Sequence, residues 1–365
     1  MGTPGQEWFQ FMEDRMSQGS KAKPAMTGHL VRVLIGLVLM AVVGVGVLAY
    51  AFTEDRAVLV RNSLVIQGSS EGDFAWRPDS PPPGFLAELS PPPDLFQAVA
   101  DSLRMVRGSN GAFDMEAARQ LVEWMHRTPG EERPIRGNTQ ETYRLIVDEG
   151  WGYCADYIRA SMAILHALGV PVRHWGMGFG DMGAGHAFLE VFLEEYDDWV
   201  FLDPYFAFYV TSPETGRPLS ALEFRDALTN EAAPDPQVQI IGDGIFSFPD
   251  RESILIYYRG AADFFYLFWG NNVFQLDEHP ITARLAPVSR SAELLAAMAL
   301  RIYPQIRPLP AASEAHATAV QQIQRIRTVL IVASILMGIL VFWVLVELVR
   351  VAGIIRKRRQ ERQLA

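Results

Sequence analysis

The only cysteine of this 365-residue chain is Cys154, which lies in the run 151–157, Trp-Gly-Tyr-Cys-Ala-Asp-Tyr. Apolar residues at helical spacing follow it as far as Gly169, so we expect a helix that begins at Cys154. The first turn of a helix has backbone N–H groups without intrahelical partners, and these groups, together with the helix dipole, favour a thiolate. The position therefore indicates a nucleophilic cysteine.

A histidine and an aspartate follow at positions where a β-hairpin would bring them together. Residues 186–193 alternate and then become apolar, residues 199–202 are apolar, and the acidic stretch 194–198 separates them. This pattern predicts two antiparallel strands. Because His186 starts the first strand and Asp203 ends the second, their side chains are expected to be neighbours.

Cysteine, histidine and aspartate are the components of a nucleophilic triad. A thiol is only slightly ionised at neutral pH, so a neighbouring imidazole has to take its proton. A carboxylate then holds that imidazole in the required tautomer and stabilises its positive form. The chemistry that these three residues predict is acyl transfer through a thioester.

The same residues resemble the transglutaminase-like superfamily, which has a papain-like cysteine enzyme core. The similarity covers about residues 135–210, in four blocks that follow the order of the family: 152–157, 167–173, 186–191 and 199–204. It implies an α+β fold in which a helix with the nucleophile packs on an antiparallel sheet. The chain is accordingly identified as a bacterial, membrane-anchored member.

The resemblance implies a role for each residue by its position in these blocks. Cys154 is the expected nucleophile, His186 the general base and then acid, and Asp203 the orienting carboxylate. Phe188 stands where the family commonly has tryptophan, and an aromatic side chain would pack there in either case. The Cys154 backbone N–H is an expected oxyanion donor, and no residue stands out as the second donor.

Two other interpretations use the same residues. A metal site could draw on the ligand types at Cys154, His166, His174, Asp181 and His186. Their spacing is irregular, and the chain has neither a Cys-x-x-Cys nor a His-Glu-x-x-His motif, so we expect no metal and no cofactor. The second interpretation is a non-catalytic module that keeps the fold to bind an envelope polymer or a protein partner. Glu190, on the same face as His186, is expected to form a salt bridge.

Two apolar segments are long enough to cross a bilayer: 33–52 has 20 residues without a charge and 329–346 has 18. The first is longer than the apolar region of a signal peptide, so we interpret it as an uncleaved anchor. Arginine and lysine flank both spans at the chain ends. Because such residues stay in the cytoplasm, we predict a two-pass protein of the cell (inner) membrane with both termini cytoplasmic and an extracytoplasmic or periplasmic catalytic domain.

These features predict a complete domain organisation. It consists of a cytoplasmic tail (1–29), a transmembrane helix (30–52), a proline-rich extracytoplasmic linker (53–93), a transglutaminase-like domain (94–275), a helical connector (276–327), a second transmembrane helix (328–350) and a basic cytoplasmic tail (351–365). Within the domain, helices are expected at 94–106, at 113–127 and from Asn138, and a loop with one short helix near 219–228 is expected over 211–240. The aromatic stretch 264–269 is expected in the core, with Trp269 exposed, and its alternatives are a substrate groove and a patch that rests on the bilayer.

Residues 53–327 contain 22 arginines, no lysine and 37 acidic residues, a net charge of −15. Such a surface repels phosphates, so nucleic acid is excluded as a partner. The expected partners are the lipid bilayer and a peptide or protein amide substrate, with a cell-envelope component as a candidate. The expected reaction is hydrolysis, as by a peptidase or amidase, or acyl transfer to an amine.

Overall fold

The computed structural model describes residues 4–51, 57–69, 71–104, 113–180, 182–183, 185–242, 248–310 and 313–364. The chain forms two compact units. One comprises Met1–Ala57 and Arg325–Ala365, and the other comprises Val58–Gln324. This division differs from the expected boundaries of the folded domain at 94 and 275, because segments on both sides of that range pack into the second unit.

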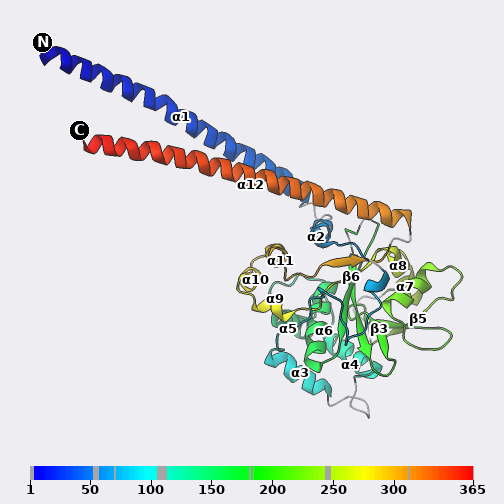
Figure 1. Cartoon of the computed structure of the whole chain (residues 1–365). Helices are drawn as coiled ribbons and strands as arrows, with labels where there is room; N and C mark the ends of the chain where they lie inside the picture. The colour runs from blue at the N-terminus through cyan, green and yellow to red at the C-terminus, as the bar shows by residue number, and fades with distance from the viewer. Residues whose placement is uncertain are drawn as a thin grey trace. The chain divides into compact units, whose positions relative to one another are not determined.

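The first unit consists of long helices (Figure 1). They are α1 (Pro4–Ala51) and the larger part of α12 (Glu314–Gln363). Both contain a stretch that is long and apolar enough to cross a membrane. Their apolar side chains are largely exposed, for example Val42 at 63% and Phe342 at 69%. Phe52, the expected end of the first span, lies outside the described residues, as do 53–56 of the expected linker.

An antiparallel sheet of five strands forms the centre of the second unit, in the order β3-β2-β1-β6-β7. The predicted hairpin is confirmed as β2 and β3, in which Leu189 pairs with Leu202. A separate two-stranded sheet pairs β4 with β5. The bounds are β1 Val172–Gly178, β2 Gly185–Leu193, β3 Asp198–Leu202, β4 Phe208–Thr211, β5 Gln237–Ile240, β6 Phe265–Phe268 and β7 Ile306–Pro308.

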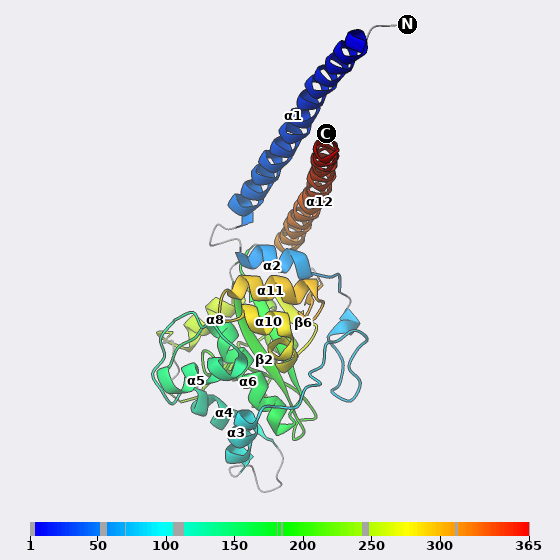
Figure 2. The ribbon, with the colours of Figure 1, turned by 90° about the vertical axis from the view of Figure 1, so that its left-hand side faces the viewer.

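Four helices gather on one face of the sheet (Figures 1 and 2). They are α3 (Asp94–Arg104), α4 (Met115–Met125), α5 (Thr139–Glu149) and α6 (Cys154–Leu168). Their buried side chains form one core with Leu189 and Val191 of β2. The helix expected from Asn138 is confirmed as α5, and Asn138 caps it by accepting from the Glu141 N–H at 2.9 Å. Residues 105 and 106 of the first expected helix lie outside the described residues.

The other face of the sheet packs against α7 (Ala221–Thr229) and α8 (Arg251–Arg259). Because side chains alternate along a strand, Phe188 points into this second core, where it is fully buried with Phe201 and Phe265. The predicted short helix near 219–228 is confirmed as α7. Two 3-10 turns, Glu71–Asp73 and Ala262–Phe264, complete the connections around this face.

The aromatic stretch 264–269 contains strand β6, which lies between β1 and β7. Phe265, Leu267 and Trp269 belong to the core, as predicted, whereas Tyr266 and Phe268 are buried but line a cavity. The expected exposure of Trp269 is wrong, because this side chain is 2% exposed. Its ring lies under the Arg307 guanidinium, with Cζ at 3.5 Å from the ring centroid, and its Nε1 donates to Pro83 O at 3.3 Å.

Residues 58–93, expected as a linker, lie along the domain. Helix α2 (Ala57–Val65) buries Leu59 and Asn62, and Ile66 forms a parallel bridge with Ile306. In the proline-rich stretch, Leu86 N–H donates to Trp269 O at 3.1 Å. Proline removes N–H donors without preventing such contacts at the residues between, so a proline-rich composition does not by itself make this stretch a spacer.

The chain after β6 forms three short helices before β7, namely α9 (Phe274–Glu278), α10 (Pro280–Leu285) and α11 (Arg290–Ala299). Strand β7, which the sequence did not predict, then adds to the edge of the main sheet.

Candidate active site

Cys154 is the first residue of α6, as predicted, and its thiol is free and half-buried. Tyr153 caps the helix in an extended conformation, and its N–H donates to Asp156 Oδ2 at 3.0 Å. Gly152 has a φ of 139°, which residues with a side chain rarely adopt. This turn directs the chain into the helix, so that the sulfur lies at the helix N-terminus.

His186 and Asp203 are hydrogen-bonded, with 2.7 Å between Nε2 and Oδ2. His186 is the second residue of β2, and Asp203 directly follows β3. Both side chains are nearly inaccessible to solvent. The hairpin thus brings together the two residues that the sequence pairs.

Asp203 has four hydrogen-bond partners. Oδ1 accepts from the N–H groups of Tyr205 at 2.9 Å and Phe206 at 3.0 Å. Oδ2 accepts from Tyr258 Oη at 2.5 Å in addition to its contact with His186. Because a buried carboxylate is costly unless it is paired and hydrogen-bonded, these donors compensate for the burial of Asp203 and fix its orientation.

The His186 ring is held by aromatic neighbours. Phe206 stacks on it with ring centroids 4.5 Å apart and an interplanar angle of 22°. Tyr257 and Tyr258 approach it edge-on, at 6.1 and 6.0 Å. These rings and the Tyr258 hydroxyl could not be predicted from the sequence, because α8 and the turn after Asp203 carry no pattern that links them to a triad.

Electrostatics favour a protonated imidazole. Burial acts to lower the pKa of His186, but the Asp203 carboxylate and the hydrogen-bonded Cys154 side chain outweigh it and raise that pKa to about 10. Since Nε2 contacts Asp203, Nδ1 is the nitrogen left for the sulfur. The arrangement therefore places an imidazolium beside the sulfur of Cys154.

Cys154 and His186 line a cavity of about 580 Å³. Strand residues His174, Tyr266 and Phe268 form part of its wall, and Arg61 of α2 and Arg290 of α11 enter it from other sides. The cavity is large enough for a peptide-sized ligand rather than for water alone.

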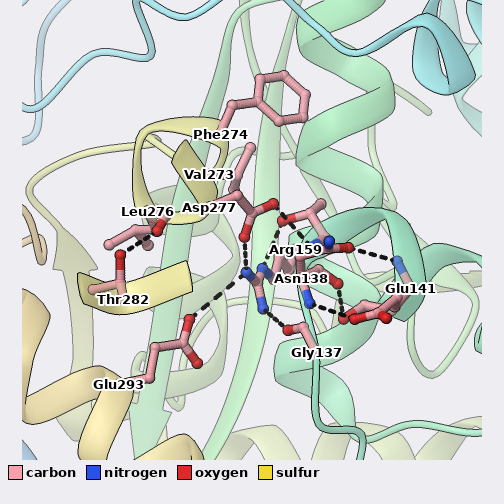
Figure 3. Close-up of polar contacts among 12 residues, drawn as sticks. Gly137, Asn138, Glu141, Arg159, Val273, Phe274, Leu276, Asp277, Thr282 and Glu293 are labelled. Carbon is pink, nitrogen blue, oxygen red and sulfur yellow. Dashed lines mark hydrogen bonds and ion pairs between the residues drawn. The ribbon is translucent and has the colours of Figure 1, made fainter. Parts of the chain in front are cut away.

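A buried arginine network secures one wall of this cavity (Figure 3). Arg159 lies on α6, and its Nε donates to Thr139 Oγ1 at 2.7 Å. Its Nη2 contacts Asp277 at 2.5 Å and Glu293 at 3.9 Å. These contacts join α5 and α6 to α9 and α11. Because removing one partner of a buried ion pair leaves an uncompensated charge, the network resists rearrangement of the wall.

The other polar residues indicated by the sequence, His166, His174 and Glu190, have partners outside the triad. His166 Nε2 contacts Asn271 O at 2.9 Å, and the His174 ring stacks on Phe268 with centroids 3.8 Å apart. Glu190 forms the predicted salt bridge, since it accepts from Arg173 Nε at 2.7 Å. Among the described residues no group of three or more His, Cys, Asp and Glu could hold a metal, and Asp181 lies outside them.

Comparison with known proteins shows that Cys154, His186 and Asp203 all lie in the segment that is similar to one protein family. Residues 101–204 match the model of the transglutaminase-like superfamily, a range that includes Cys154, His186 and Asp203. No curated protein matches the chain in sequence. Among solved structures, the chain is similar to the periplasmic domain of TgpA from Pseudomonas aeruginosa bound to ethylmercury, with 22% identity and a TM-score of 0.25. That match covers 31% of this chain and 44% of the TgpA structure.

Proposed function

This chain carries a transglutaminase-like domain, and we propose that the domain is a cysteine enzyme that acts on amide bonds through a thioester intermediate. The observation that carries the proposal is the buried His186–Asp203 pair beside a cysteine at a helix N-terminus. A binding module that only retains the fold has no need of this arrangement.

The reaction follows from the positions of these groups. The Cys154 thiolate attacks the amide carbonyl carbon, and the Cys154 backbone N–H stabilises the negative charge that develops on the oxygen. The His186 imidazolium gives its proton to the leaving amine as the C–N bond breaks, which leaves a thioester. Water or an amine then attacks the thioester while His186 takes a proton from it, and Cys154 is released.

We further propose that this reaction takes place outside the cytoplasm. The two apolar helices in α1 and α12 would serve as membrane spans, and the basic residues at both ends of the chain would remain in the cytoplasm. The domain between them would then face the periplasm. A peptide or protein amide of the cell envelope would be its substrate.

An acyl-enzyme trap tests the reaction. Full-length protein in detergent micelles is incubated with peptides, proteins or a digest of envelope polymers, quenched in acid and weighed by mass spectrometry. We expect an adduct on Cys154 that hydroxylamine removes and that Cys154→Ala lacks. Ser161→Ala is the matched control, because Ser161 is buried on the same helix and its hydroxyl has no partner within the described residues. If wild-type protein forms no adduct and releases no amine from any of these substrates, the proposal is wrong.

A further inference from the structure

Four arginines line the cavity that contains Cys154, and they differ in how their charges are balanced. Arg159 is paired with Asp277, and Arg290 contacts Glu293 at 2.9 Å. Arg136 is exposed to solvent, where water screens its charge. Arg61 is half-buried, and no carboxylate of the described residues lies within ion-pair distance of it.

The Arg61 guanidinium is held in place by a neutral group. Its Nε and Nη2 donate to Asn62 Oδ1, at 3.0 and 2.8 Å. Asn62 is fully buried and in turn donates to Met182 O at 2.9 Å. The Arg61 Cζ lies 5.9 Å from the centroid of the Phe268 ring. These contacts orient the guanidinium but do not neutralise it.

Apart from Cys154, the titratable side chains around Arg61 are also uncharged. Burial, followed by the charge of Arg61, lowers the pKa of His174 to about 3, so that imidazole is neutral. Its Nε2 is buried without a hydrogen-bond partner among the described residues. Burial raises the pKa of Tyr266, so its phenol remains protonated despite the opposing effect of Arg61. Tyr303 lines the same part of the cavity.

A partly desolvated cation without a carboxylate partner is costly unless an anion completes its surroundings. We infer that Arg61 binds a carboxylate of the acyl substrate. It thereby selects substrates that carry a carboxylate near the amide that Cys154 attacks. Guanidinium donors match the two oxygens of a carboxylate, and Tyr266 and Tyr303 add hydroxyl donors at the cavity wall. Arg61 and Cys154 line the same cavity, so both groups can contact one substrate.

The surrounding charge makes this site selective. With a net charge of −15 over residues 53–327, the domain repels anions in general. A carboxylate-bearing substrate would therefore be stabilised at Arg61 and disfavoured elsewhere on the surface. Arg61 lies on α2, outside residues 101–204, which match the superfamily. The proposed specificity therefore comes from a segment that is not part of the shared core.

This inference deepens the proposed amide chemistry, but it can be tested without turnover. Iodoacetate and iodoacetamide alkylate a thiol by the same displacement of iodide. They differ only in that iodoacetate carries a carboxylate where iodoacetamide carries a neutral carboxamide. For each protein we would measure the ratio of the two rates at Cys154. We expect Arg61→Gln to lower the iodoacetate-to-iodoacetamide ratio about tenfold, with Arg61→Lys between it and wild type. Arg284→Gln, which changes an exposed arginine outside the cavity, should keep the wild-type ratio.

A second measurement needs no variant. Glutarate should protect wild-type Cys154 from iodoacetamide saturably, and the uncharged diamide glutaramide should not. An unchanged alkylation ratio in Arg61→Gln, or equal protection by glutarate and glutaramide, would overturn the inference even if the enzyme cleaves amides. Conversely, a lowered ratio in a protein that forms no acyl adduct would support the carboxylate site while the proposed reaction failed.

Discussion

The hydroxyl of Tyr258 donates to the same Asp203 oxygen, Oδ2, that contacts His186. Tyr258 lies on α8 and is fully buried in the core between that helix and the sheet. Burial, followed by the Asp203 charge, raises the pKa of Tyr258 well above its ordinary value, so the phenol is a permanent donor. The packing of α8 is thereby connected to the orientation of the triad carboxylate.

Tyr258 should act as a positioning residue, and Tyr258→Phe tests this role. Without its donor, Asp203 loses one of four hydrogen bonds, and we expect kcat to fall about tenfold with little change in KM. The pKa of His186 should rise, because the carboxylate shares its charge with one donor fewer. Tyr257→Phe is the matched control, since it leaves all the bonds to Asp203 intact. Equal pH–rate profiles for wild type and Tyr258→Phe would show that the bond is only structural.

The His186–Asp203 pair should also make stability depend on pH. The pKa of His186 in the fold, about 10, lies above the ordinary 6.5. The folded state therefore binds more protons than the unfolded chain between these values. The contribution of the pair is fully present below pH 6.5 and is lost as the pH rises through about 10.

Denaturant unfolding from pH 6 to 10 measures this dependence. We expect the free energy of unfolding to decline over that range for wild type, and the decline to be reduced in Asp203→Asn. The same variant should lose acyl transfer by orders of magnitude, because an amide can hold the wrong tautomer and does not stabilise the cation. An identical pH slope in both proteins would contradict the assigned pairing.

Strand β6 packs into the core that α7 and α8 form with the sheet, and the ring of its first residue, Phe265, should be indispensable to stability. Phe265 is fully buried, so Phe265→Ala should remove about 3 to 5 kcal/mol. For a domain of this size that corresponds to a fall in Tm of roughly 6 °C or more. Ile256→Ala changes an apolar residue that is 58% exposed and serves as the control. A shift of only about 1 °C for Phe265→Ala would mean that this ring is not part of the stabilising core.

The elements that could be predicted from the sequence are those whose signals are local. The helix that begins at Cys154 has its cap and its apolar spacing within one short segment, and the hairpin that unites His186 and Asp203 has only a four-residue turn between its strands. Each pattern specifies its own backbone, so the position of Cys154 and the proximity of His186 to Asp203 could be inferred without knowledge of the rest of the fold.

Residues that reach the site through tertiary packing could not be predicted in this way. Arg61 and Tyr258 enter from α2 and α8, and neither has a motif that relates it to Cys154. The proline-rich stretch was misleading for a related reason. Composition indicated a spacer, whereas Leu86 and Glu88 bind the chain that follows β6, with Glu88 Oε2 accepting from Val273 N–H at 2.6 Å.

The single cysteine offers a direct test of membrane topology. In spheroplasts, a small membrane-impermeant methanethiosulfonate reagent should label Cys154, because the domain is proposed to lie outside the cytoplasm. In a Cys154→Ala background, Gln360→Cys should be labelled only after the membrane is permeabilised. Labelling of Gln360→Cys in sealed spheroplasts would exclude a cytoplasmic C-terminus.

The proposed reaction depends most on an imidazolium–thiolate pair at His186 and Cys154. The pH dependence of iodoacetamide alkylation measures that pair directly. A free thiol reacts about tenfold more slowly for each pH unit below its titration, because only the thiolate is nucleophilic. We predict that folded wild-type protein reacts at pH 6 much faster than a free thiol and at nearly the same rate as at pH 8, and that His186→Ala abolishes this advantage. A wild-type rate that falls in parallel with that of the free thiol between pH 8 and pH 6 would contradict the assignment of Cys154 as an activated nucleophile.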